Sequence, residues 1–252
     1  MAEDIASLSP DQLQQFEQLS ANLAAVRARV DVAALRAGRA PAEVRVLPVS
    51  KTVPQERLRL AVLAGCTELG ENKVQELRRK AEEMEDVAVR WVLVGHLQTN
   101  KARDAVGFAS EFQALDSLRL AEALDRRLQA AGRSLDVLVQ VNTSGEESKF
   151  GLEPEDTLPF LEQLPSYSSL RVRGLMTLAA NTADVERVRG CFALLRELRD
   201  QAREADLVGP GELSMGMSGD LDLAVEEGAT CVRVGQAIFG GRPNAGAPSP
   251  VA

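Results

Sequence analysis

Lysine is scarce in this chain of 252 residues, although basic residues are not. The sequence holds 29 lysines and arginines, of which only five are lysines, and none of these lies before Lys51 or after Lys149. Arginine therefore supplies nearly all the positive surface charge, and each remaining amine becomes a candidate for chemistry that needs an amine. The alternative, for most of these lysines, is that they persist by chance in an arginine-rich chain and have no chemical role.

Other absences exclude whole classes of function. Three cysteines, Cys66, Cys191 and Cys231, lie far apart and fit no zinc spacing, and the single histidine, His96, rules out a multi-histidine metal site. We expect three buried thiols in a reduced, cytoplasmic protein. The net charge of −8 argues against sequence-independent nucleic-acid binding. No apolar run approaches the roughly 20 residues of a membrane span, and the acidic N-terminus is unlike a signal peptide.

The first predicted element is an N-terminal helix. Ser9 is placed to cap it, Pro10 occupies its first turn, and Gln12 completes a capping box. Apolar residues then recur at steps of three and four, which predicts one buried stripe. Gly38 and Pro41 end the helix.

Short apolar segments then alternate with helical patterns. The predicted strands are Val44–Lys51, Thr67–Glu71, Trp91–His96, Glu111–Asp116, Asp136–Asn142, Arg171–Leu178, Glu212–Met217 and Cys231–Gly235. Helices are predicted near 54–64, 72–85, 98–107, 117–132, 154–164, 182–206 and 219–228. Strict alternation gives parallel strands, and eight strands in about 250 residues predict a single (β/α)8 barrel of the TIM type, in the α/β class.

The alternative to this barrel is an open doubly wound sheet. It is weakened because no G-x-G-x-x-G fingerprint follows the first strand. We expect one barrel domain over residues 1–242. Residues 243–252 are rich in Gly, Pro and Ala and are predicted to be a flexible tail.

The carboxyl ends of barrel strands carry active sites, and candidate residues collect there. Lys51 ends the first strand, where an amine partly removed from water can attack a carbonyl; a lysine reaching to solvent is the alternative. The segments 214–220 and 233–236 end strands seven and eight, and their small residues before helix starts suit an anion. A simple N-cap by Ser218 and a structural ion pair by Arg233 are the alternatives.

Three further positions need a separate interpretation. We expect His96 to be a hydrogen-bonded residue rather than a catalyst, and Lys149 to pair with Glu146 or Glu147 rather than to serve as a second aldehyde site. Lys80 looks like helix surface.

Together, the strand-end amine, the anion cradle and an inward arginine suit an aldehyde that carries a phosphate, such as pyridoxal 5′-phosphate. A Schiff-base aldolase acting on a phosphosugar is the alternative.

Seven linked motifs give the chain a family resemblance. It resembles the pyridoxal phosphate homeostasis proteins, which are similar to the N-terminal barrel domain of alanine racemase. The resemblance runs from about residue 10 to 242. The motifs that carry it are Val49–Val53, Gly70–Glu76, Gly95–Lys101, Val141–Gly151, Gly174–Thr177, Leu213–Asp220 and Arg233–Gly240.

The resemblance implies a cofactor, pyridoxal 5′-phosphate, and a set of residues that bind it. Lys51 would form a Schiff base with the cofactor aldehyde, and Asn72 would lie near the ring. Arg233 would approach the pyridine nitrogen and keep it unprotonated, because an arginine does not readily give up a proton. Met215 and Met217 would flank the cofactor.

The same resemblance implies a phosphate site. Ser218, Gly235 and Gln236 would hold the phosphate, mainly through backbone N–H groups. The chain departs from many relatives at Lys73, where they carry tyrosine, and at Leu69, where they carry phenylalanine. These departures concern the edge of the pocket.

The family is viewed as lacking an established catalytic turnover, which implies a carrier or buffer role in vitamin B6 homeostasis. A racemase-like enzyme acting on amino acids is the alternative, but racemisation on this barrel needs a second base. The single tyrosine, Tyr167, precedes strand six, away from the predicted mouth. The expected partners are pyridoxal 5′-phosphate and apo-enzymes that depend on it, with no nucleic acid and no membrane, and we expect a monomer.

Overall fold

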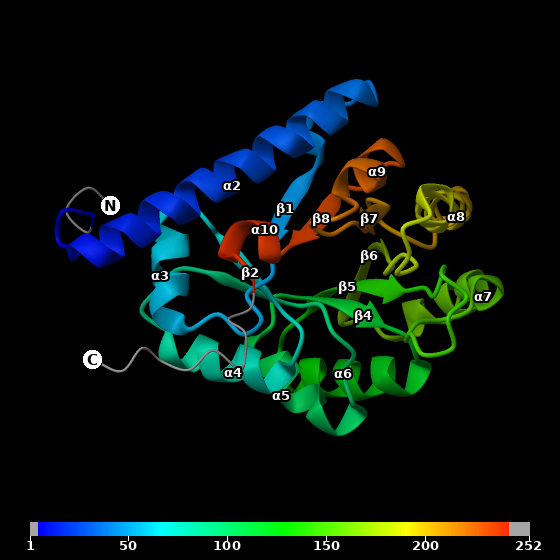
Figure 1. Ribbon diagram of the computed structural model, residues 1–252. Coiled ribbons are helices and arrows are strands. Elements are labelled where there is room, and N and C mark those ends of the chain that lie inside the picture. The colour runs from blue at the N-terminus through cyan, green and yellow to red at the C-terminus, as the bar shows by residue number, and fades with distance from the viewer. Residues whose placement is uncertain (1–4, 242–252) are drawn as a thin grey trace.

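The computed structural model describes residues 5–241, so the tail predicted for residues 243–252 lies outside the described residues. Within that range, eight strands form one parallel sheet (Figure 1). They are β1 (Arg45–Pro48), β2 (Glu68–Glu71), β3 (Arg90–Leu93), β4 (Glu111–Leu115), β5 (Leu135–Gln140), β6 (Leu170–Met176), β7 (Glu212–Ser214) and β8 (Cys231–Val234).

The sheet curls into a nearly closed barrel. Its strand order is β1-β8-β7-β6-β5-β4-β3-β2, so from β2 onward each strand neighbours the next in the sequence, and β8 returns to β1. The seam between β1 and β2 is joined by a bridge from Val49 to Gly70 and by the Ser50 N–H, which donates to the Gly70 carbonyl at 2.8 Å. The predicted (β/α)8 barrel is therefore confirmed.

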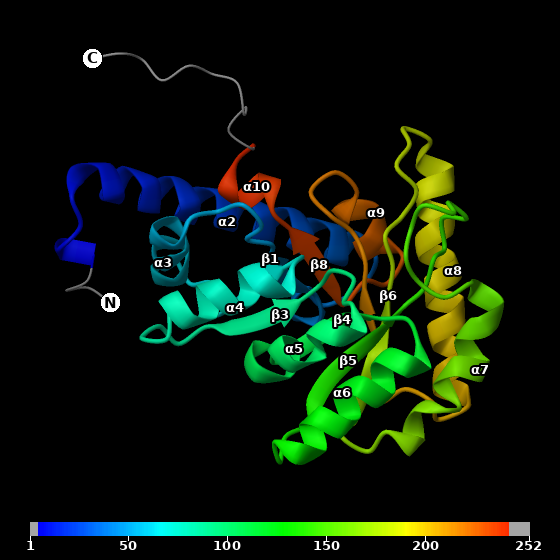
Figure 2. The ribbon, with the colours of Figure 1, turned by 90° about the horizontal axis from the view of Figure 1, so that it is seen from below.

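Helices surround this barrel on the outside (Figure 2). They are α2 (Pro10–Arg36), α3 (Gln55–Leu63), α4 (Val74–Glu83), α5 (Ala102–Phe108), α6 (Leu118–Ala130), α7 (Thr157–Leu161), α8 (Val185–Glu204), α9 (Leu221–Glu226) and α10 (Gln236–Phe239). Short 3₁₀ turns lie at Pro41–Glu43, Thr99–Lys101, Pro154–Asp156 and Leu164–Ser166. Among residues 5–241, no helix is both long enough and apolar enough to cross a membrane.

The extra N-terminal helix α2 begins as the sequence predicts. The Gln12 N–H donates to Ser9 Oγ at 3.3 Å, and the Ser9 N–H donates to Gln12 Oε1 at 2.9 Å. This reciprocal capping box satisfies two backbone donors of the first turn. The helix ends at Arg36, and Gly38 follows with a φ of +68°, in the left-handed region that glycine tolerates.

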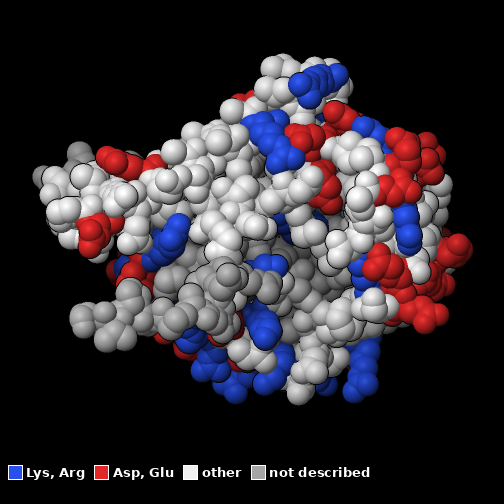
Figure 3. Space-filling model, in the orientation of Figure 1, with Lys and Arg blue, Asp and Glu red and all other residues white. Residues whose placement is uncertain are grey.

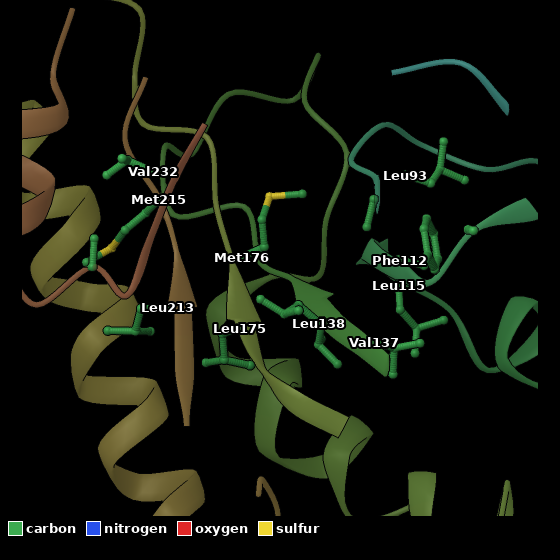
Figure 4. Packing of buried hydrophobic residues seen from close by; sticks show 14 of the residues in the cluster. Leu93, Phe112, Leu115, Val137, Leu138, Leu175, Met176, Leu213, Met215 and Val232 are labelled. Atoms are coloured by element: carbon green, nitrogen blue, oxygen red, sulfur yellow. The ribbon is translucent and has the colours of Figure 1, made fainter. Parts of the chain in front are cut away.

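The main apolar core lies between the strands and the helices. Phe112, Leu115, Val137, Leu175 and Leu213 are fully buried there, and Figure 4 shows part of this packing. We call this region the outer layer. It also holds most of the hydrophobic burial that stabilises the fold.

The inside of the barrel, which we call the lumen, is different. A small separate cluster of buried apolar residues, Leu47, Val92 and Cys231, packs there. All three cysteines are buried and unbridged, as expected. Buried polar side chains also lie in the lumen, among them Glu111, Gln113, Ser214 and Arg233. Of these, the sequence predicted only that Arg233 points inward.

Several strands end earlier than predicted. The first ends at Pro48 rather than Lys51, the third at Leu93 rather than His96, and the seventh at Ser214 rather than Met217. Beyond these points the chain leaves the sheet ladder and forms loops at the barrel mouth. The predicted strand ends are therefore wrong by a few residues, and those residues belong to the mouth.

Candidate functional site

A cavity of about 1820 Å³ opens at the carboxyl ends of the strands. Its lining includes most of the residues that the sequence singled out: Lys51, Asn72, Met217, Ser218, Arg233, Gly235 and Gln236. Figure 3 shows basic side chains in and beside the hollow of this face. The fold thus gathers loops that are far apart in the sequence into one site.

Met215 is the exception among the predicted cofactor residues. It is fully buried, it does not line the cavity, and it packs in the outer layer. In Figure 4 it lies in the same apolar cluster as Leu213 and Val232. A contact between Met215 and a ligand in the cavity has no support from this arrangement.

Lys51 stands on a tight, strained turn rather than on the end of a strand. The Val53 N–H donates to the Ser50 carbonyl at 3.0 Å, which closes the turn around Lys51 and Thr52. Thr52 has a φ of +66°, a conformation that β-branched residues rarely adopt. Such strain persists only where the surroundings hold it in place.

A buried charge pair lies beneath this turn. The Lys80 amine donates to Glu71 Oε1 at 2.6 Å and to the Ser50 carbonyl at 2.8 Å. Ser50 Oγ also donates to Glu71 Oε1, at 2.7 Å. Lys80 is fully buried, so its interpretation as helix surface was wrong. Its partner Glu71 lies on β2 and Lys80 on α4, so the pair forms only when the helix packs against the strand.

Backbone donors without an acceptor among residues 5–241 collect in the loops after β7 and β8. Within residues 5–241, no hydrogen bond is formed by the backbone N–H groups of Ser218, Gly219, Gly235 and Gln236. All four of these residues line the cavity. Groups of this kind favour an anion, because an unpaired backbone donor is costly to leave unmet.

The two loops that carry these donors are tied together. The Ala237 N–H donates to Ser218 Oγ at 3.3 Å, which joins the loop after β7 to α10. From α2, Arg29 Nη1 donates to the Ser218 carbonyl at 2.8 Å, and Arg29 Nε donates to Asp222 Oδ2 at 2.9 Å. The alternative that Ser218 is a simple N-cap of the next helix is wrong, because Asp220 occupies the N-cap of α9. Ser218 instead ties its loop to α10, and α2 helps to hold both loops.

Arg233 enters the cavity from the lumen and forms no ion pair with an acidic residue among residues 5–241. Its Nη1 donates to Ser214 Oγ and its Nη2 to the Thr177 carbonyl, each at 2.7 Å. The side chain is almost fully buried, and this burial lowers the pKa of the Arg233 guanidinium from its ordinary value. Both acceptors are neutral, so the alternative of a structural ion pair is wrong.

Asn72 is fixed at the cavity by close packing of the chain. A Cβ atom added to Gly95 would lie 2.0 Å from the backbone oxygen of Asn72. Only glycine at position 95 therefore allows the two mouth loops to approach this closely. The backbone of Asn72 gains a defined position from this contact.

His96 lines the cavity as a hydrogen-bonded residue, as expected. Its Nδ1 lies 3.2 Å from Asp116 Oδ2, and its ring stacks on Phe150 with centroids 3.9 Å apart. Burial raises the pKa of the Asp116 carboxyl, and His96 opposes that rise. The stack joins the loops after β3 and β5 across the mouth.

The lysines of the chain converge on this site. Lys51, Lys73, Lys101 and Lys149 line the cavity, and Lys80 lies beneath the Lys51 turn. The Lys149 amine donates to Glu146 Oε1 at 2.9 Å and to the Ala179 carbonyl at 2.7 Å, which confirms the predicted pairing. Within residues 5–241, no cluster of three or more His, Cys, Asp or Glu is placed to hold a metal ion.

Comparison with known proteins identifies the family. The family described as alanine racemase, N-terminal domain, matches residues 21–243. A protein of Pseudomonas aeruginosa named pyridoxal phosphate homeostasis protein is 42% identical over 232 residues, which cover 92% of this chain and 98% of that protein. This chain belongs to the pyridoxal phosphate homeostasis protein family. The resemblance found in the sequence motifs is confirmed.

Solved structures of other proteins agree with the fold. The structure of PipY from Synechococcus elongatus with pyridoxal phosphate bound is 36% identical, with a TM-score of 0.77, covering 88% of this chain and 100% of that one. An alanine racemase from Streptomyces lavendulae is only 16% identical, with a TM-score of 0.71, covering 89% of this chain and 57% of that one. The racemase likeness concerns the barrel alone.

Proposed function

We propose that this chain binds pyridoxal 5′-phosphate as a Schiff base on Lys51 and acts in intracellular vitamin B6 homeostasis as a carrier or buffer. One observation carries the proposal: a single cavity combines the Lys51 amine with four backbone N–H groups that have no acceptor in the part of the chain that the structure describes. An amine and an anion cradle are the two features that a phosphorylated aldehyde requires. The names and ligand of the relatives support the same cofactor.

The residues of the cavity fit this cofactor. Ser218, Gly235 and Gln236 would hold its phosphate, and Asn72 and Met217 would lie beside its ring. When bound, pyridoxal 5′-phosphate supplies an aldehyde carbon and an electron-withdrawing ring. Arg233 would donate to the ring nitrogen and so keep a proton off that atom, which weakens the ring as an electron sink.

A storage role suits the cavity better than turnover. Racemisation requires bases on both faces of the bound substrate, and the single tyrosine, Tyr167, packs against the core and does not line the cavity. Lys51 is exposed to solvent, so a bound aldehyde can exchange with the surroundings. The expected partners are apo-enzymes that depend on the cofactor. The chain acts as a cytoplasmic monomer that engages neither nucleic acid nor membranes.

Spectroscopy and labelling test the proposal. Addition of pyridoxal 5′-phosphate to the purified chain is expected to produce visible absorbance, and borohydride is expected to fix the cofactor on Lys51, located by mass spectrometry. Lys51→Ala should abolish the absorbance and the label. Lys101→Ala, which removes another amine of the same cavity, should retain both. Unchanged affinity and absorbance in Lys51→Ala would show that the assignment of Lys51 is wrong.

Proton exchange separates the carrier from a racemase-like enzyme. The loaded chain is incubated with L-alanine in deuterated water, and exchange of the α-proton is followed by NMR. Only slow exchange is expected, since any accessible imine gives some. Exchange at enzyme-like rates that is lost in Lys51→Ala would show that the chain is a racemase-like enzyme and not a carrier.

A further inference from the structure

A chain of polar side chains runs through the lumen and ends at Arg233. It begins at Arg45 on β1, which lines a second hollow of about 490 Å³ at the other end of the barrel. Glu111 and Gln113 on β4 and Ser214 on β7 lie between the two arginines, and all three are almost fully buried. No sequence motif singled out Gln113.

The hydrogen bonds that link these polar side chains are short and continuous. Arg45 donates to both carboxylate oxygens of Glu111, at 2.8 and 2.9 Å. Gln113 Nε2 donates to Glu111 Oε1 at 2.6 Å, and Ser214 Oγ donates to Gln113 Oε1 at 2.7 Å. Arg233 Nη1 then donates to Ser214 Oγ at 2.7 Å.

The direction of each hydrogen bond is fixed by the one before it. An ionised carboxylate can only accept, so Gln113 must turn its amide nitrogen to Glu111 and its oxygen to Ser214. The Ser214 hydroxyl has a single hydrogen, which it gives to that oxygen. Ser214 can then only accept from Arg233, and this holds one end of the guanidinium in place.

Gln113 also sets the charge around Arg233. The charged and titratable groups that face this part of the lumen are Arg45, Glu68, Glu111, Cys231 and Arg233. From the cavity side, Asp220 in the loop after β7 also acts on the charge of Arg233. Glu111 and Glu68 both bind Arg45, at the other end. A neutral amide separates these carboxylates from Arg233, so the positive charge of Arg233 stays available to the cavity that it lines.

We propose that Gln113 is a positioning residue that aims the Arg233 guanidinium into the cavity and insulates it from the acidic end of the lumen. The inference rests on the proposed function for the identity of the ligand, because the group that Arg233 would meet is the ring nitrogen of pyridoxal 5′-phosphate. Gln113 itself touches no ligand. Its effect reaches the cavity only through Ser214 and Arg233.

Two substitutions separate positioning from packing. Gln113→Leu keeps the approximate volume but removes the hydrogen bonds to Glu111 and from Ser214, so the Ser214 hydroxyl is free to rotate. Gln113→Glu keeps the shape. When protonated, the new carboxyl donates to Glu111 and accepts from Ser214 as the amide does; when ionised, it repels Glu111. Val92→Ala is the matched control, since it loosens the packing of the lumen beside Glu111 but removes no hydrogen-bonding side chain.

The first measurement needs no cofactor. Exchange of the Arg233 side-chain N–H with water is followed by NMR on the ¹⁵N-labelled chain, with the signal assigned by its loss in Arg233→Lys. Exchange should be about tenfold faster in Gln113→Leu, the usual effect of losing one buried hydrogen bond. In Gln113→Glu it should approach the wild-type rate at pH about 5 and the Gln113→Leu rate at pH about 8. Val92→Ala should stay within about twofold of wild type while its unfolding midpoint falls.

The second measurement uses the cofactor. The Kd for pyridoxal 5′-phosphate should rise about tenfold in Gln113→Leu, and the pH dependence of the bound absorbance should shift. The inference is overturned if Gln113→Leu shows the same Arg233 N–H exchange rate, the same Kd and the same bound absorbance as the wild-type chain. If Gln113→Leu does not fold, the pH dependence of Gln113→Glu decides, and a profile parallel to wild type overturns it. A wild-type chain that takes up no cofactor would end the proposed function, whereas the exchange rates would still decide the role of Gln113.

Discussion

The lumen and the outer layer of this barrel are made of different residues, although the same strands supply both. In the outer layer, β4 contributes Phe112 and Leu115 to a continuous apolar core. Toward the lumen, the same strand contributes Glu111 and Gln113 to a chain of hydrogen bonds. Barrels of this type usually fill the lumen with branched apolar side chains.

This difference shows how the fold divides its tasks. The outer layer buries enough apolar surface to hold the barrel together. The lumen then need not be apolar, and its side chains can orient a cation toward the mouth. A polar lumen is tolerated because its members satisfy one another, whereas an unpaired buried group would be costly.

The largest expected effect comes from the buried charge pair between β2 and α4, which breaks the apolar pattern of the outer layer. Lys80→Met leaves Glu71 buried without its cation, and loss of one partner of such a pair costs about 3–5 kcal/mol. The free energy of unfolding in urea measures this loss. The double variant Lys80→Met with Glu71→Gln should recover much of it, because the orphaned charge is gone. A loss below about 1 kcal/mol in the single variant would mean that the pair contributes little.

A smaller effect is expected from a matched pair of leucines, one in each region. Leu93 lies in the outer layer and Leu47 in the lumen, and both are fully buried. Leu93→Ala should cost about 3–4 kcal/mol and Leu47→Ala about 2–3 kcal/mol, since a cavity beside polar groups can take up water. Urea unfolding of both variants checks the order. A greater loss in Leu47→Ala would show that the lumen packing is as important as the outer layer.

The smallest effect concerns two thiols, again one in each region. Burial raises the pKa of the Cys66 thiol from 9.0 to about 11, and burial also raises the pKa of Cys231, with Arg45 opposing. The unfolded chain therefore loses these protons first as the pH rises above about 9, and the folded chain binds more protons. Stability conferred by the neutral thiols is present below that pH and falls toward pH 11.

Urea unfolding at pH 8, 9 and 10 measures this dependence. Relative to wild type, Cys66→Ala should flatten the decline by about 1 kcal/mol per pH unit above pH 9. Cys231→Ala should flatten it as well. Parallel curves for wild type and a variant would show that the thiol concerned does not titrate differently in the two states.

Much of the fold followed from local patterns. The order of the strands could be predicted because apolar runs alternate with helical ones, and the start of α2 because its capping residues are neighbours in the sequence. Most of the candidate site followed too, since residues such as Lys51 and Arg233 sit where strands end. The strand ends themselves were less predictable, because apolar residues continue into the mouth loops after the ladder stops.

What escaped prediction depends on which face a residue takes and on distant partners. Lys80 directly follows two arginines of the same charge on α4, and nothing in the local sequence separates it from them. Only its contact with Glu71 in the folded chain does so. Gln113 has no charge and no motif, so nothing marked it. Met215 could have been placed by alternation: Ser214 points into the lumen, so its neighbour points into the outer layer.

The distribution of lysines has one more consequence if the cavity holds a reactive aldehyde. An aldehyde bound as an imine can pass from one amine to the next, and on an ordinary protein surface it would migrate from lysine to lysine. Here the side-chain amines that can accept it line the cavity, and Lys80 is buried beneath them. The other basic side chains are arginines, whose guanidinium groups stay protonated. The lysines of residues 5–241 therefore offer a bound aldehyde no path beyond the cavity, and it leaves through the mouth.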